Sequence, residues 1–336
     1  MRDSSASKTF NIPINSASLG TLRQSLLNWY DASHRDLPWR REPEPYRVWV
    51  SEIMLQQTRV AAVLEHYACW MERFPTVQDL AKAREQTVLG IWSGLGYYHR
   101  ARRLHQAAKV IVRKHNGEFP CTAEGWRELP GIGRYTAAAI ASIAFGESVA
   151  VVDGNVERVL DRMFGACDNK ERTWLGAEAL LDRSRPGDFN QAMMELGAMI
   201  CTPKSPQCPV CPLIPWCAAR GAVTAVPQSA RKRKQIQYAV ATTGGAVLLV
   251  QRPSNAQRMA NMWELPESSN ASNAQALATF RHSITDTDYD IAVMPASDRL
   301  VGSLNGKARW FTRKQWRKLA LTGLTRKILR KLSPAT

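Results

Sequence analysis

The stretch LPGIGRYTA, residues 129–137, decides the fold of this chain. Its proline and two glycines predict a tight hairpin between a short helix and a longer one, because glycine tolerates positive φ and lets the backbone approach a ligand closely. The free N–H groups at the start of the second helix make a site for one phosphate. We therefore predict a phosphate-binding helix-hairpin-helix with Gly131 and Gly133 in its turn.

The sequence on both sides of this hairpin has helical periodicity. Up to about residue 220, apolar residues recur at helical spacing between short Gly/Pro breaks, and no long period-two alternation occurs. The pattern predicts a mainly α-helical region. Its helices are expected over Thr21–His34, Val48–Ala68, Arg100–His115, Arg134–Phe145 and Val156–Phe164.

The composition changes after residue 220. Residues 238–250, YAVATTGGAVLLV, predict two strands around a Gly-Gly turn. A second strand pair is expected near Asp290–Val293 and Arg309–Phe311, and a basic amphipathic helix over Thr312–Leu332. The predicted organisation is a disordered segment at 1–20, a helical domain at 21–220, a linker at 221–237 and an α+β domain at 238–336.

Four cysteines lie close together at the end of the helical region: Cys201, Cys208, Cys211 and Cys217, within CTPKSPQCPVCPLIPWC. Four soft ligands at such short spacing suit a [4Fe–4S] cluster or a tetrahedral zinc ion. Two disulfides or chance burial are the alternatives, but nothing else in the sequence indicates an oxidising compartment. The unequal spacing, with one C-x2-C pair, favours iron–sulfur over a zinc ribbon.

The charge of the chain is strongly positive and unevenly distributed. The net charge is +16, and residues 221–336 carry 18 Lys+Arg against 6 Asp+Glu. This asymmetry favours a polyanionic partner, with a basic surface that only aids solubility as the alternative. No apolar run reaches the length of a membrane span, and the first twenty residues lack the apolar core of a signal peptide. We expect an intracellular, cytoplasmic protein that is neither secreted nor bound to a membrane.

Two carboxylates stand in contrasting sequence contexts. Asp153 ends an apolar run and precedes a helix, which predicts an N-cap whose backbone N–H groups keep it ionised. Glu52 lies in a helix that is apolar nearly all round, so lost hydration should raise its pKa. Its alternative is a surface glutamate paired with Arg47 or Arg59. An acid and a charge stabiliser of this kind suit cleavage of an N-glycosidic bond.

Several motifs resemble adenine DNA glycosylases of the MutY family, in the endonuclease III superfamily. They are LPWR at 37–40, SEIMLQQT at 51–58, GLGYY at 94–98, NQAMMELG at 190–197 and the cysteine loop. The resemblance covers roughly residues 22–220 and implies a helix-hairpin-helix glycosylase with a [4Fe–4S] cluster. It also implies that a monomer excises adenine mispaired with 8-oxoguanine or guanine from double-stranded DNA during base excision repair.

The resemblance assigns roles to individual residues. Glu52 would protonate N7 of adenine, and Asp153 would stabilise the sugar cation. Tyr135 and Asn155 would hydrogen-bond beside them, and Gly131 and Gly133 would contact the DNA backbone. Without the family, the remaining positions would be assigned to ordinary core or surface. Within the family, Gln57 and Tyr97 would wedge into the base stack. The pocket for the flipped adenine would be lined by Arg35, Leu37, Trp39, Arg40, Leu55 and Glu195.

Tyr135 occupies the position at which bifunctional endonuclease III relatives carry a Schiff-base lysine. A tyrosine cannot form that adduct, and the guanidinium of neighbouring Arg134 stays protonated. We therefore expect a monofunctional glycosylase that uses water as the final nucleophile.

The C-terminal region resembles the MutT-like, or Nudix-like, domain of MutY proteins. It lacks the glutamate-rich metal-binding helix of that domain's hydrolase relatives, so a reader is expected instead of a hydrolase. The family's Phe-Ser-His loop recognises 8-oxoguanine, whereas the aligned positions here hold Ile284, Thr285 and Asp286. Thr285 keeps a hydroxyl, but Asp286 and Asp288 bring negative charge. Two alternatives follow: a glycosylase with altered opposite-base or target-base specificity, or a non-catalytic DNA-binding module of the same fold.

Overall fold

The computed structural model describes residues 14–165, 169–222, 231–256, 259–268, 275–284, 286–304 and 308–332. Backbone packing divides the chain into two compact units, each made of two segments. The first unit contains residues 1–56 and 110–226, and the second contains 57–109 and 227–336. Because this division follows packing and not chain order, the predicted domain boundaries near 220 and 238 stay a prediction.

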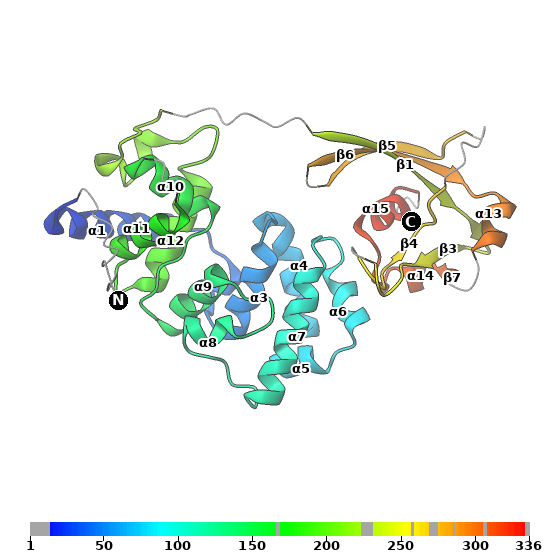
Figure 1. The fold of residues 1–336 in the computed structure, drawn as a ribbon, viewed down its shortest axis with the longest axis horizontal. Coiled ribbons are helices and arrows are strands. Elements are labelled where there is room, and N and C mark those ends of the chain that lie inside the picture. Colours follow the sequence, from blue (N-terminus) through cyan, green and yellow to red (C-terminus); the bar gives the residue numbers. More distant parts are fainter. Residues whose placement is uncertain are drawn as a thin grey trace, which may run out of the picture. The chain divides into compact units, whose positions relative to one another are not determined.

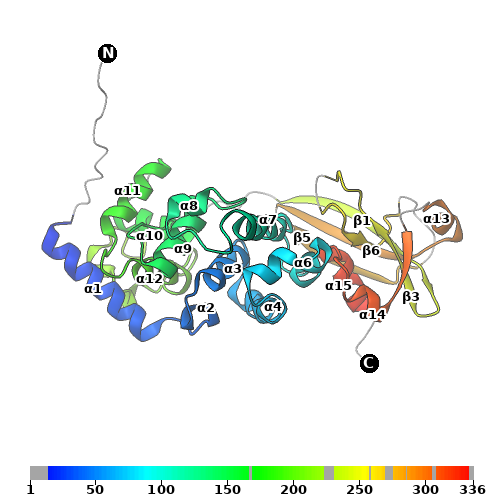
Figure 2. The ribbon, with the colours of Figure 1, turned by 90° about the horizontal axis from the view of Figure 1, so that it is seen from below.

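The first unit is helical, with its elements visible in Figures 1 and 2. Helix α9 packs against α3, α8 and α12, and α12 also packs against α1 and α10. The elements are α1 (Ser16–Ser33), α2 (Pro38–Arg41), α3 (Pro45–Leu55), α8 (Ala123–Arg127), α9 (Arg134–Phe145), α10 (Gly154–Phe164), α11 (Lys170–Leu180), α12 (Pro186–Met199) and the 3-10 turns Cys208–Val210 and Ile214–Trp216.

Aromatic packing fixes the position of α3. Trp49 on this helix is fully buried and lies 5.6 Å, centroid to centroid, from Trp126 on α8. Phe119 in turn stacks on Trp126 at 5.8 Å. Burying the rings of Trp49 and Trp126 contributes several kcal/mol, of order 1.5–3 kcal/mol for each side chain. The helix that carries Glu52 is therefore held firmly against the hairpin region.

The predicted helices are largely confirmed, with two corrections. Helix α1 begins at Ser16 because the side chain of Asn15 caps it, accepting from Ser18 N at 2.8 Å. Residues 16–20, predicted to be disordered, are therefore helical. The single helix predicted over Val48–Ala68 is wrong, since α3 ends at Leu55 and α4 begins at Val60. Gln57 has φ 56°, a left-handed conformation that interrupts helical hydrogen bonding.

The second unit combines helices with two sheets (Figure 1). One sheet has the order β1-β6-β5, with β1 parallel to β6; the other has the order β2-β3-β4, with β7 paired to β3. Figure 1 shows α15 between them. The elements are α4 (Val60–Arg73), α5 (Val77–Lys82), α6 (Glu85–Trp92), α7 (His99–Lys114, whose last residues belong to the first unit), β1 (Lys232–Val240), β2 (Thr242–Thr243), β3 (Ala246–Gln251), β4 (Trp263–Glu264), β5 (Ala278–Ile284), β6 (Thr287–Pro295), α13 (Asp298–Ser303), β7 (Ala308–Thr312), α14 (Arg313–Trp316) and α15 (Gly323–Leu332).

The C-terminal predictions hold in part. Two strands do flank the Gly244-Gly245 turn. The strands predicted near residues 290 and 310 exist but do not pair with each other, because β7 returns to the other sheet and pairs with β3. The predicted closing helix is divided into α14 and α15, and β1 already begins at Lys232, inside the predicted linker. Over the described ranges, no helix is both long enough and apolar enough to cross a bilayer.

Candidate active site

Glu52 lies in the interior of the first unit, on α3. Glu52 is 5% exposed, and Tyr135 Oη on α9 donates a 2.6 Å hydrogen bond to Glu52 Oε2. The same hydroxyl lies 3.4 Å from Met194 Sδ on α12. The alternative of a surface ion pair with Arg47 is wrong, since Arg47 pairs with Glu42 and Glu44 instead. Three helices therefore enclose one carboxyl group.

This environment changes the acidity of Glu52. Burial raises its pKa to about 7; the Tyr135 hydrogen bond acts in the opposite direction, and the charge of Asp153 adds to the rise. Burial, together with the nearby Glu52 and Asp153 charges, raises the pKa of Tyr135 well above its ordinary value. The phenol therefore keeps its proton and acts as a donor. Near neutrality Glu52 is protonated in a substantial fraction of molecules, as a general acid must be.

The carboxylate of Asp153 is hydrogen-bonded at the start of α10. Its Oδ1 accepts from Asn155 N at 2.9 Å and Val156 N at 2.8 Å, and its Oδ2 accepts from Asn155 Nδ2 at 2.9 Å. The positive end of the helix dipole favours negative charge at this position. The predicted N-cap is confirmed, and the carboxylate remains close enough to raise the pKa of Glu52.

Residues that sequence reasoning missed support this arrangement. Arg158 Nη2 donates to Asn155 Oδ1 at 2.9 Å and to Gly197 O at 2.7 Å, while its Nε donates to Cys201 O at 2.8 Å. A Cβ at Gly197 would lie 2.6 Å from Asn155 Cβ, so only glycine allows this close approach. A glycine within an otherwise apolar helical pattern was the available signal for such packing.

Glu195 forms a second buried carboxylate in the same unit. Its side chain is 1% exposed and receives Arg35 Nη2 at 2.6 Å and Arg40 Nη2 at 2.8 Å. Burial alone would raise its pKa, but the hydrogen bonds from these two guanidinium groups lower it to about 2. Of the other predicted pocket residues, Leu37 and Trp39 are buried and Leu55 is half-buried. The structure therefore brings the three charged pocket candidates together.

The hairpin has the predicted backbone at one of its two glycines. Gly131 has φ 82°, which other residues rarely adopt. Gly133 is extended at φ −93° and precedes α9 without a side-chain cap. The expectation of positive φ therefore applies to Gly131 only. With no side chain capping α9, its leading N–H groups are available to an anion.

The predicted wedge and reader residues belong to the second unit. Gln57 and Tyr97 both have left-handed backbones, at φ 56° and 46°, and Tyr97 is 38% exposed. Asp286 lies in the turn between β5 and β6, where it pairs with Lys232 at 3.6 Å; Thr285 lies outside the described residues. Their roles in wedging and reading stay predictions.

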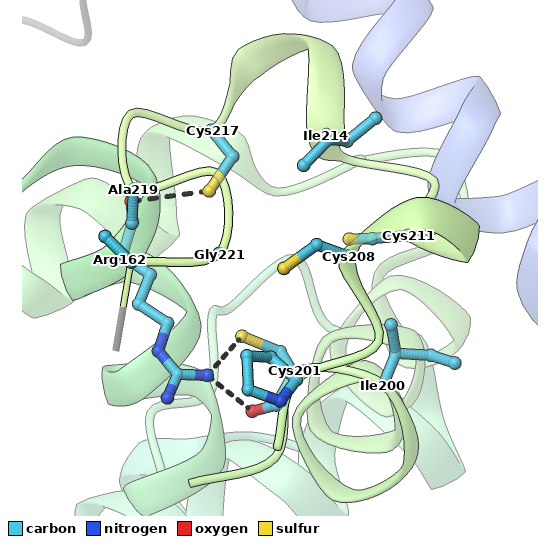
Figure 3. Close-up of a pocket in the computed structure, with 11 residues that line it drawn as sticks. Arg162, Ile200, Cys201, Cys208, Cys211, Ile214, Cys217, Ala219 and Gly221 are labelled. Carbon is cyan, nitrogen blue, oxygen red and sulfur yellow. Dashed lines mark hydrogen bonds between the residues drawn. The ribbon is translucent and has the colours of Figure 1, made fainter. Parts of the chain in front are cut away.

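The four clustered cysteines line a single cavity (Figure 3). All four are free thiols, so the disulfide alternative does not hold. Arg162 Nη1 lies 3.2 Å from Cys201 Sγ. Burial, followed by the charges of the other cysteines, raises the pKa of Cys211 to about 11. Four soft sulfur ligands lining one cavity fit an iron–sulfur cluster, whose binding would take the protons from the thiols, although no metal-ion group is preassembled within the described ranges.

Comparison with known proteins agrees with this geometry. Residues 50–179 match the family described as HhH-GPD superfamily base excision DNA repair protein. The adenine DNA glycosylase of Homo sapiens is 51% identical over 61% of this chain and 40% of its own length. That of Rattus norvegicus is 37% identical over 94% of this chain and 78% of its own length. The match thus spans less than half of the human relative.

Solved structures give the same fold. The structure of a thermostable thymine-DNA glycosylase superposes with a TM-score of 0.56 and 29% identity, covering 60% of this chain and 96% of that one. Both the predicted fold class and the predicted resemblance are therefore confirmed. By its sequence similarity over most of the rat protein and by its helix-hairpin-helix fold, the chain belongs to the adenine DNA glycosylase family.

Proposed function

We propose that this protein is a monofunctional adenine DNA glycosylase that excises adenine mispaired with 8-oxoguanine or guanine in double-stranded DNA. The observation that carries the proposal is the pair of carboxylates in the first unit. Glu52 is buried with a pKa of about 7, and Asp153 is hydrogen-bonded to the start of α10. A binding module would need neither a neutral acid nor a sheltered anion.

The proposed reaction divides the work between the two groups. Glu52 donates its proton to N7 of adenine while the bond between the sugar C1′ and N9 breaks, and the bonding electrons leave with the base. Asp153 stabilises the positive charge that develops on the sugar. Water then adds to C1′ and transfers a proton to the Glu52 carboxylate, which regenerates the neutral acid and leaves a neutral sugar product. Tyr135 and Asn155 orient the two carboxylates through the hydrogen bonds at 2.6 and 2.9 Å.

The absence of an amine nucleophile supports hydrolysis without strand cleavage. Tyr135 stands where a Schiff-base lysine would stand, and its raised pKa makes it a hydrogen-bond donor. The assembly of buried Glu195 with half-buried Arg35 and Arg40 is proposed to bind the flipped adenine. Gly131 and Gly133 are proposed to contact one phosphate of the backbone through the N–H groups that begin α9.

A [4Fe–4S] cluster is proposed as the cofactor, held by Cys201, Cys208, Cys211 and Cys217. When bound, it would neutralise the four thiolates and hold the loop of residues 201–217 in one conformation. Iron and sulfide analysis with the visible absorption spectrum of purified protein would test this. Zinc in place of iron would contradict it.

One experiment tests the proposed activity. Duplexes carrying a single adenine opposite 8-oxoguanine, guanine or cytosine are incubated with the protein, and free adenine and abasic sites are measured. We expect release opposite 8-oxoguanine and guanine, little opposite cytosine, and no covalent adduct with borohydride. No adenine release from any duplex would contradict the proposal, and a trapped adduct would contradict its monofunctional part.

A second candidate keeps the chemistry and changes the opposite base. It is favoured by the β5–β6 hairpin, where Asp286 stands at the position of the family's histidine and Asp288, in β6, adds a second negative charge. Both carboxylates are already paired, Asp286 with Lys232 at 3.6 Å and Asp288 with Arg231 at 2.8 Å. Equal or faster release opposite guanine than opposite 8-oxoguanine would support this candidate.

A further inference from the structure

Arg100 is a buried arginine at the first turn of α7, in the second unit. The residue is 5% exposed, although arginine rarely occupies an interior. Its Nη2 donates to Thr58 Oγ1 at 3.2 Å, to Leu95 O at 3.2 Å and to Gly96 O at 3.3 Å. One guanidinium nitrogen therefore joins the segment after α3 to the loop between α6 and α7.

The same guanidinium lies over the ring of Tyr97 in that loop and over the ring of Trp92 at the end of α6. Its carbon lies 5.4 Å from the centroid of Tyr97 and 5.2 Å from that of Trp92. Trp92 Nε1 donates to Gly96 O at 2.9 Å, and the backbone N–H of Arg100 donates to Tyr97 O at 2.9 Å. Cation–π attraction grows when the cation is desolvated, as it is here. Burial lowers the pKa of Arg100 to about 10, so the group remains a cation at neutral pH.

The two segments that Arg100 joins share an unusual backbone feature. Gln57, beside Thr58, and Tyr97 both adopt left-handed φ values without being glycine. Such conformations persist only where surrounding contacts hold them, and they gather at functional sites. Gln57 and Tyr97 are also exposed, so their side chains are available to a partner. The backbone beside each of them is held by contacts with the buried Arg100.

The far side of the loop is fixed independently. Tyr98 Oη and Ser93 Oγ both donate to Leu321 O, at 3.1 and 3.0 Å, from the turn that precedes α15. These bonds hold Ser93, at the start of the loop, and Tyr98, directly after Tyr97. They do not reach the segment that contains Gln57, for which Arg100 supplies the connection through Thr58.

We propose that Arg100 is a positioning residue that sets Gln57 and Tyr97 in the mutual arrangement needed to enter the base stack when adenine is flipped. The proposal rests on the proposed function and on the wedge role that the family resemblance assigns to these two residues. Arg100 itself touches neither the base nor the reacting atoms. Losing it should therefore impair extrusion of the base and leave the protonation chemistry of Glu52 unchanged.

The test separates extrusion from chemistry. Arg100→Met keeps much of the buried volume and removes the guanidinium group with its hydrogen-bond donors. Arg100→Lys keeps the positive charge but has a different donor geometry. Exposed Arg103, on the same helix, provides the matched control Arg103→Met. Extrusion is followed by the fluorescence of 2-aminopurine placed next to the target adenine, and chemistry by single-turnover release at several pH values.

We expect Arg100→Met to lower single-turnover release roughly 100-fold, as misplacement by about 1 Å can do, and to suppress the fluorescence rise. Arg100→Lys should fall between Arg100→Met and wild type, and Arg103→Met should keep the wild-type fluorescence rise. The pH profile should be unchanged, and the loss should shrink on duplexes in which the adenine is bulged and already unstacked. A normal fluorescence rise in Arg100→Met, or an equal loss on bulged adenine, would overturn the proposal.

Thr58→Val covers the case in which Arg100→Met does not fold. It removes one hydroxyl acceptor at nearly constant volume, and circular dichroism checks folding. A several-fold loss of extrusion that is not additive with Arg100→Lys is expected, since both changes break one connection. Full additivity, or wild-type extrusion in Thr58→Val, would overturn the proposal. If wild-type protein releases no adenine, the proposed function fails, which is a separate outcome.

Discussion

Glu52 and Glu195 are both buried glutamates of the first unit, yet their surroundings give them opposite charge states. Glu52 on α3 accepts a hydrogen bond from the Tyr135 phenol and is affected by the nearby charge of Asp153, and burial raises its pKa to about 7. Glu195 on α12 meets two guanidinium groups, which lower its pKa to about 2 in spite of burial. The difference teaches that burial alone does not determine the charge of a carboxyl group, because ionic partners can reverse the rise in pKa that burial causes.

The contrast divides two functions between two similar side chains. A neutral Glu52 can deliver a proton, whereas the ionised Glu195 can only accept hydrogen bonds and hold Arg35 and Arg40. Removing a charge or a partner at either site therefore tests this contrast.

The largest effect is expected from Glu52→Gln. The amide keeps the shape and a hydrogen-bonding group for Tyr135 but has no acidic proton, so single-turnover adenine release should fall about 10³-fold or more. Binding to duplexes containing the mispair should stay within a few-fold of wild type, as measured by electrophoretic mobility shift. Release near the wild-type rate would remove Glu52 from the acid role.

Asp153→Asn should have the next largest effect. Asparagine is as good an N-cap as aspartate, so α10 should remain capped while the negative charge beside the sugar is lost. Removing one electrostatic stabiliser of a transition state costs roughly 10²–10³-fold in rate. The melting temperature should change little. If the variant unfolded instead, the carboxylate would be structural, and the assignment would need revision.

Glu195→Gln tests the other member of the comparison. It leaves Arg35 and Arg40 without their anion, and we expect a loss of about 2 kcal/mol of unfolding free energy, reduced from a fully buried pair because Arg35 is partly exposed. The stabilisation from Glu195 is present above its unfolded pKa and lost as pH falls toward 2. The unfolding free energy of the variant should therefore depend less steeply on pH in the acid range than that of the wild type. An unchanged acid limb would show that the pair contributes nothing.

Much of this contrast could be predicted from the sequence. The apolar neighbours of Glu52 predicted its raised pKa, and the position of Asp153 before a helix predicted its N-cap; both are confirmed. Both depend on local sequence, namely helical periodicity and the residue before a helix. The helix-hairpin-helix was predictable for the same reason, since glycine and proline mark its turn.

The remaining features depend on contacts that are distant in sequence. Arg40 and Glu195 are 155 residues apart, and only the family resemblance placed both in one pocket. Arg158 and Gly197 had no local signal that connected them to Asn155. The pairing of β7 with β3 was missed because strand patterns show which residues are extended but not which strand is the neighbour.

The pH dependence of activity follows from the raised pKa of Glu52. Only the protonated carboxyl can act, so single-turnover release should be nearly constant below pH 7 and fall about tenfold per unit above it. Because this pKa is higher in the folded protein, Glu52 stabilises folding below its unfolded value and loses that contribution as pH rises through about 7. Rates flat from pH 6 to 9 would contradict the assignment.

The smallest change is expected from Tyr135→Phe. The Tyr135 hydroxyl stabilises ionised Glu52, so its removal should raise the pKa of Glu52 further and move the alkaline limb upward by about one pH unit. Tyr98→Phe is the matched control, because it also removes a buried hydroxyl, whose bond goes to Leu321 O in the second unit. The alkaline limb of the pH–rate profile should not move in Tyr98→Phe. A downward shift in Tyr135→Phe would mean that the phenol stabilises the neutral acid, and the orienting role of Tyr135 would have to be rewritten.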